Sequence, residues 1–209
     1  MKSLNDFIAE KLKIAKDTHA KKDIIVVDSL EELKYIIEQE TRKNGNECDL
    51  NHIDISNLDT LDGLFEDSAF NGDISKWDTS NVVSMVKLFS GSDFDGDISG
   101  WDVSKVEDMS HMFEYSEFEG DISEWDVRNV KDMSRMFERS IFKGSLQKWY
   151  VSNVVNMTRM FNHSEYKDFK SINYWEPDSL KYAKDMFDGS PLEDSLPEWY
   201  QNFLKQNKA

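Results

Sequence analysis

Residues 94–113 read FDGDISGWDVSKVEDMSHMF, and close variants of this stretch recur along most of the chain. Its tryptophan belongs to a series whose members are 24 residues apart, except for one spacing of 26. The chain has 6 tryptophans, and all of them stand in this series: Trp77, Trp101, Trp125, Trp149, Trp175 and Trp199. A second aromatic series keeps the same period: Phe65, Phe89, Phe113, Phe137, Phe161 and Phe187. Self-similarity at a fixed period of this length is typical of repeat architectures, so the sequence predicts one here.

The two halves of each repeat have different patterns. In residues 104–113 the apolar side chains fall at positions i, i+3, i+6 and i+7, which is one face of a short helix. Ser104 followed by Glu107 has the form of a capping box at the start of that helix. Residues 96–101 are too short and too polar for a helix, and they suit a short strand that points Ile98 inward.

A unit with one short strand and one short helix cannot bury its apolar face alone, whereas stacked units bury their apolar side chains in continuous columns. The predicted fold class is α/β. We expect a right-handed, leucine-rich-repeat-like solenoid with one short strand plus one short helix per repeat of about 24 residues, and with a helical N-terminal cap. The residues expected to form its structural core are Trp77, Trp101, Trp125, Trp149, Trp175, Trp199, Phe89, Phe113, Phe137 and Phe161.

Four segments are expected along the chain. Residues 1–22 have the apolar stripe of an amphipathic helix, which could pack on the cap, mediate self-association or be mobile. Residues 23–49 form the N-terminal cap, a strand followed by a helix that begins with a second capping box. Residues 50–200 form the repeat solenoid, and residues 201–209 are a C-terminal tail.

Composition narrows the function classes. The chain has 209 residues and a formal net charge of −16, which disfavours direct binding to nucleic acid because phosphates are neutralised by basic surface. The single Cys48 excludes a disulfide within the chain and a thiolate metal cluster. The chain as given has no signal peptide, lipid-attachment cysteine or membrane span, which predicts a cytoplasmic protein that does not act on membranes.

Two stretches of the sequence resemble the repeat of a known protein family. Residues 70–82, FNGDISKWDTSNV, and residues 133–137, MSRMF, resemble the repeat of BspA-type leucine-rich-repeat proteins. This bacterial repeat of the form Asp-Ile-Ser-x-Trp-Asp was long catalogued as a domain of unknown function, and the resemblance covers residues 24–200. It implies a non-catalytic repeat protein. Many members of that family are secreted or lipid-anchored surface proteins linked to adhesion, and others have no export signal.

One polar constellation stands out as a candidate partner-binding surface. Aspartate recurs on the outward side of the strand in three repeats, so that carboxylates would lie about 4.8 Å apart and repel one another. Three compensations are open: hydrogen bonds from the adjacent turn, a divalent cation between coils, or a basic partner surface. The candidate residues are Asp73, Ser75, Asp97, Ser99, Asp121, Ser123 and Glu124.

Other polar columns are interpreted as structural. Basic residues recur on the predicted helices at Lys87, His111, Arg135 and Arg159. The acids three residues away, expected to pair with them along each helix, are Asp108, Asp132, Glu114 and Glu138. We find no phosphate-binding loop, no metal-ligand spacing and no nucleophile–histidine arrangement, so no catalytic residue, metal or cofactor is predicted.

The sequence therefore predicts a non-enzymatic, cytoplasmic protein-binding repeat module whose acidic surface meets a protein partner with a basic surface. One alternative is a phage-type acidic inhibitor that mimics nucleic acid and blocks a basic, nucleic-acid-binding defence enzyme. Another is a surface adhesin whose export signal is missing from the chain as given. Self-association would use the N-terminal helix.

Overall fold

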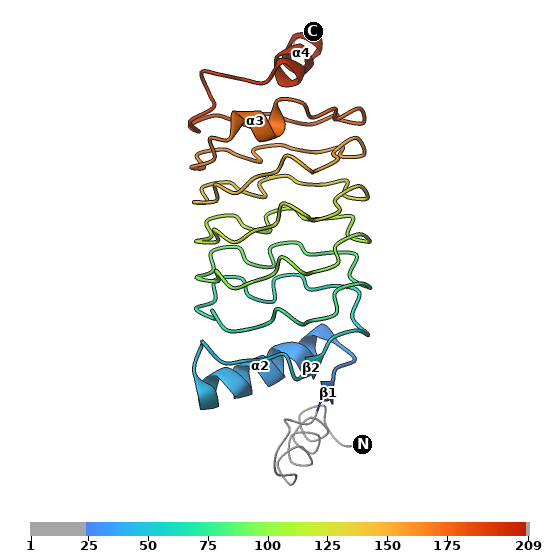
Figure 1. Cartoon of the computed structure of the whole chain (residues 1–209), viewed down its shortest axis with the longest axis vertical. Coiled ribbons are helices and arrows are strands. Elements are labelled where there is room, and N and C mark those ends of the chain that lie inside the picture. The colour runs from blue at the N-terminus through green and yellow to red at the C-terminus, as the bar shows by residue number, and fades with distance from the viewer. Residues whose placement is uncertain (1–23, 208–209) are drawn as a thin grey trace.

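The structure is a computed structural model that describes residues 24–207. The helix expected over residues 1–22 and the final residues 208 and 209 lie outside the described residues. The described chain winds into flattened coils that lie one above another (Figure 1). Helix α2 (Leu30–Asn44) lies at one end of this stack and helix α4 (Glu198–Gln206) at the other.

Helix α2 covers the first coil because its apolar side faces the core. The Ser29 hydroxyl caps it by accepting a hydrogen bond from the Glu32 amide at 3.2 Å. Leu33, Ile36 and Ile37 are buried, and the helix ends at Gly45, whose φ of 84° is a conformation that glycine adopts without strain.

Parallel pairing connects each coil to the next. Strand β1 (Ile25–Val26) pairs in parallel with strand β2 (Ile53–Asp54), in the register Ile25 to Ile53. Beyond β2 the pairing consists of single parallel bridges. One joins Asp49 to Asp73, and the others form a continuous ladder through Thr60, Ser84, Asp108, Asp132, Asn156 and Tyr182.

The expected short helix in each repeat is wrong for the described coils, because residues 104–113 and their equivalents form consecutive turns. The described residues contain three helices: α2, α3 (Phe169–Ile172) and α4. Instead of bonding within a helix, the amides of Met109, His111 and Phe113 donate to carbonyls of the next coil at 2.9, 2.8 and 2.9 Å. A ten-residue segment is too short to be a stable helix by itself, and the neighbouring coil offers each amide a better-placed acceptor.

The expected position of the strand is also corrected. The bridge ladder follows the second half of each repeat, where the helix was expected, whereas the first-half pairing within residues 24–207 is confined to β1 with β2 and to the bridge between Asp49 and Asp73. Residues with a left-handed backbone conformation recur in the second half of the repeats. His111, for example, has a φ of 60°, and Arg135 and Arg159 have a φ of 56°.

Aromatic columns fill the core. Successive rings from Phe65 to Phe187 stack with centroids 5.6 to 5.7 Å apart. Each indole N–H in the tryptophan series donates to a backbone carbonyl of the preceding coil, for example from Trp101 to Ile74 at 3.2 Å. Of the ten residues expected in the core, nine are buried and Trp199 is half-buried. The aromatic period therefore coincides with the coil period.

Two departures from the repeat have local causes. The two extra residues between Trp149 and Trp175 are accommodated by helix α3, which Asp168 caps by accepting from the Ser171 amide at 3.3 Å. Helix α4 crosses the expected boundary at residue 200 and includes part of the expected tail, because Trp199, Tyr200 and Phe203 pack against the last coil.

Candidate functional site

The aspartates of the predicted surface are held by local turns. Asp73 Oδ1 accepts hydrogen bonds from the Ser75 amide at 3.0 Å and from the Ser75 hydroxyl at 2.7 Å. Asp97 and Ser99 repeat this pair at 3.0 and 2.7 Å. The Asp121 carboxylate accepts from the Ser123 amide at 2.9 Å. Asp followed two residues later by Ser favours such a turn, so each carboxylate is held in a fixed orientation at the surface.

These hydrogen bonds keep the carboxylates ionised. The pKa of Asp73 is lowered by the Asn51 side chain and by the amide and hydroxyl of Ser75. The Ser99 hydroxyl and amide lower the pKa of Asp97, and the negative charges of Asp73 and Asp121 oppose them. The Ser123 amide has the largest effect in lowering the pKa of Asp121. Hydrogen bonds to the charged form thus outweigh the repulsion between neighbouring coils.

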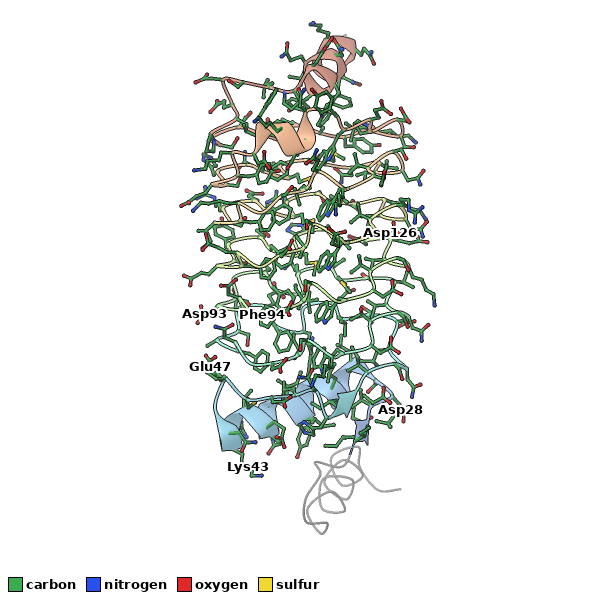
Figure 2. All side chains as sticks on the ribbon, viewed as in Figure 1. Asp28, Lys43, Glu47, Asp93, Phe94 and Asp126 are labelled. Atoms are coloured by element: carbon green, nitrogen blue, oxygen red, sulfur yellow. The ribbon has the colours of Figure 1, made fainter. Side chains whose placement is uncertain are left out.

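The structure extends this surface with acids that the sequence analysis missed. Asp93 and Asp95 precede Asp97 in one coil, and Glu117 and Glu119 precede Asp121 in the next; all of these side chains are exposed. The signal was available, because acidic residues occupy these positions in two successive repeats. Figure 2 shows Asp93 and Glu47 at the edge of the stack opposite Asp126. We use the term acidic surface for the three aspartates of the predicted column together with these four additional acids: Asp73, Asp93, Asp95, Asp97, Glu117, Glu119 and Asp121.

Other candidate residues have their polar groups occupied. Glu124 forms an ion pair with Lys148 of the next coil, and the hydroxyls of Ser75 and Ser99 donate to their own aspartates. Glu119 is 3.6 Å from the ammonium group of Lys143, which lies closer to Glu165 at 2.7 Å. The centre of the acidic surface therefore lies in the coils of Asp97 and Asp121.

Metal-ligating residues do not gather in this part of the chain. Among residues 24–207, no group of three or more histidine, cysteine, aspartate or glutamate side chains is placed to hold a metal ion. Cys48 is buried and is not in a disulfide.

The basic column of Lys87, His111, Arg135 and Arg159 lies in the turns that follow the bridge residues, and not on helices. His111 contacts Glu114 at 2.6 Å, and Arg135 lies 3.3 Å from Glu138 and 3.7 Å from Glu114. Arg159 in turn lies 3.9 Å from Glu138, so these ion pairs connect successive coils as well as positions three residues apart. Burial raises the pKa of Glu114, but the hydrogen bond with His111 and the nearby cations outweigh burial and leave the pKa lowered.

Asp108 and Asp132, which were expected to pair with the basic column, have a different role. Both are bridge residues of the ladder, and their carboxylates accept from the amides of Ser110 and Ser134 at 2.8 and 2.7 Å. Both carboxylates therefore stabilise a turn within their own coil, and that of Asp132 also accepts from the Asn156 side chain of the next coil at 2.9 Å.

A groove of about 330 Å³ lies between the last coil and α4. Its apolar lining comes from Trp175, Pro177, Leu180, Trp199 and Phe203. Two carboxylates, those of Glu176 and Asp178, line it as well. The repeat pattern does not predict this groove, because the groove depends on how α4 packs on the stack.

The recurring coils and the parallel pairing between them define a repeat-type domain. The chain matches the family described as "Mycoplasma protein of unknown function, DUF285" over residues 31–140 and 114–207, and it therefore belongs to that family. No curated protein and no solved structure matches it. Among the helices of the described residues, none has the length and apolar character needed to cross a membrane.

Proposed function

We propose that this chain is a non-catalytic, cytoplasmic protein-binding module, and that its acidic surface takes a protein partner with a basic surface. The proposal includes a right-handed solenoid of the BspA-type leucine-rich-repeat kind, in which turns replace the repeat helices. The observation that carries it is the acidic surface, where hydrogen-bonded turns orient Asp73, Asp97 and Asp121.

Fixed carboxylates suit this role physically. A side chain that is already oriented loses little conformational freedom when a partner binds, so less of the interaction energy is lost to ordering. A concentrated negative surface also steers a basic partner toward one face and raises the association rate. The net charge of −16 acts in the same direction at longer range.

The test compares capture of partners from native-cell lysate by the wild-type chain and by two charge-reversed variants. The first variant carries Asp97→Lys with Asp121→Lys in the acidic surface. The matched control carries Asp188→Lys with Asp194→Lys, which changes the net charge equally at exposed positions near the C-terminal end. We expect the first variant to lose a partner that the control retains.

Two further conditions, higher salt and added nucleic acid, distinguish the possible modes of partner binding. Capture should weaken from low salt to about 0.5 M salt, where the Debye length is about 4 Å. A partner retained equally by all three chains would overturn the assignment to the acidic surface. Release of the partner by added DNA or RNA would instead favour the inhibitor that mimics nucleic acid.

A further inference from the structure

The groove at the C-terminal end of the stack exists because the tryptophan series stops there. Five tryptophans of the series, from Trp77 to Trp175, are at most 4 % exposed. Trp199 is the last member, lies in α4 and is half-buried. Its ring has Trp175 on one side at 6.3 Å and the edge of Tyr200 at 5.7 Å. No further coil covers Trp199 within residues 24–207, which leaves apolar aromatic surface at the groove.

The carboxylates of the groove lack the cations that acids find elsewhere in the stack. Glu107 and Glu119 each meet a lysine of the following coil, 24 residues later. Glu176 and Asp178 are exposed and form no ion pair within residues 24–207. Within residues 24–207 the last coil is followed by α4, which places no lysine within ion-pair distance of these two acids, so their negative charge stays uncompensated beside the aromatic lining.

We propose that this groove binds an arginine side chain of a protein partner. A guanidinium group is planar and weakly hydrated, so it stacks on an indole face and still offers N–H donors to carboxylates. Its aliphatic stem covers apolar surface such as Leu180 and Phe203. Glu176 and Asp178 supply the acceptors for charge-assisted hydrogen bonds.

This inference rests on the proposed function, because it gives the basic partner one anchoring side chain. It adds a site that is distinct in residues from the acidic surface and that recognises shape as well as charge. An aromatic groove that takes one arginine and is closed off from water by the partner is the kind of contact that contributes strongly to an interface.

The direct test adds N-acetylarginine amide to the full chain and follows the indole N–H signals by NMR. The signals of Trp175 and Trp199 should shift and saturate, while those of Trp77, Trp101 and Trp125 should stay in place. The variant Trp199→Phe assigns the Trp199 signal. If neither groove signal shifts, the inference is wrong.

Two further probes separate charge from shape. N-acetylcitrulline amide has nearly the same shape as the arginine probe without its charge, and N-acetylnorleucine amide is apolar. Both should bind at least about tenfold more weakly than the arginine probe, because neither has the positive charge needed for an ion pair with the carboxylates. If the norleucine probe binds as well as arginine, the groove recognises apolar surface, and if the citrulline probe does, it recognises shape and hydrogen bonding without charge; either result overturns the inference.

Substitutions then test which carboxylates bind the arginine probe. Glu176→Gln with Asp178→Asn should weaken arginine binding at least about tenfold, whereas Asp97→Asn with Asp121→Asn should leave it unchanged. Unchanged binding by the groove variant would overturn the inference. Failure of the proposed function has a different signature: arginine still binds the groove, but partner capture is insensitive to charge reversal in the acidic surface.

Discussion

Each indole of the tryptophan series both packs and sets the register between coils. Trp101 packs its ring at 6.4 Å from Trp77 and at 6.1 Å from Phe89, while its N–H donates to the Ile74 carbonyl. A shift of one residue would remove the hydrogen bond and bring a polar side chain into the column. The same residue thus stabilises the coil and fixes its alignment.

Trp101→Ala should lower the free energy of unfolding by about 3–5 kcal/mol, as truncation of large buried aromatic residues does. The loss combines the transfer of apolar surface with the cavity left between two coils. Urea denaturation followed by circular dichroism measures it. Trp101→Phe serves as the control and should cost less, because it keeps a ring in the column. An unchanged midpoint for Trp101→Ala would contradict its place in the core.

The surface aspartates make stability depend on pH. In the unfolded chain an aspartate has a pKa of about 3.9, and the turn hydrogen bonds lower the pKa of Asp73, Asp97 and Asp121 in the folded protein. The unfolded chain therefore binds protons first as the pH falls. Their contribution is present above about pH 4 and is lost as the pH drops through the folded pKa values.

Asp97→Asn should make the fall in stability below about pH 4 shallower and should change stability near neutral pH only slightly. The reason is that an asparagine oxygen can still accept from the Ser99 amide, while the titrating group is gone. Thermal melts between neutral and acidic pH measure the effect. A slope identical to that of the wild type would show that Asp97 has the same pKa in both states.

At the scale of the element, the coil turns depend on close approach of one coil to the next. A Cβ atom added to Gly72 would lie 2.1 Å from the Cys48 carbonyl oxygen of the preceding coil, and that backbone atom cannot move without disturbing the stack. Gly100, by contrast, has no atom within 4 Å of such a Cβ. The stack therefore excludes a side chain at Gly72 and has room for one at Gly100.

Gly72→Ala should destabilise the protein by about 1–3 kcal/mol or more, which is the usual cost of forcing extra volume into a packed site. Gly100→Ala is the matched control and should leave the free energy of unfolding nearly unchanged. Chemical denaturation of both variants tests the pair. Equal stability of the two variants would mean that the coils separate easily at Gly72.

At the scale of the whole molecule, stability accumulates coil by coil. Inter-coil hydrogen bonds recur with the repeat, as in the bonds from Met85 to Asp108, Met109 to Asp132 and Met133 to Asn156, each at 2.9 Å. Each coil contacts mainly its two neighbours, so the stack behaves as a one-dimensional array of similar units. Helices α2 and α4 cover its two ends (Figure 1).

Deletion of residues 97–120 removes 24 residues and joins Gly96 directly to Asp121, which restores the repeat. This variant should fold, with a denaturant m-value lower by about a tenth because less surface is buried. Deletion of residues 97–108 removes half a repeat and should prevent cooperative folding, because the aromatic columns lose their register. Cooperative unfolding of both deletion variants would contradict coil-by-coil packing.

The sequence by itself determined which residues form the columns. Residues such as Trp101 and Phe113 recur every 24 residues, and equal spacing places them above one another in any stack of coils of that length. For Asp97 the sequence left three compensations open, and the structure shows the hydrogen-bonded turn with Ser99. Only the tertiary structure decided that Met109 to Phe113 form turns and not a helix, since the outcome depends on acceptors in the next coil.

The two candidate sites also combine features that the sequence predicts with features that depend on tertiary contacts. The aspartate column was visible in the sequence, whereas the neutralisation of Glu124 by Lys148 depends on a contact between coils. The groove beside Trp199 depends on the angle at which α4 leaves the last coil, and no periodic signal encodes that angle. Periodicity specifies what repeats, but the ends of a stack are set by tertiary packing alone, because there the repeated neighbour is absent.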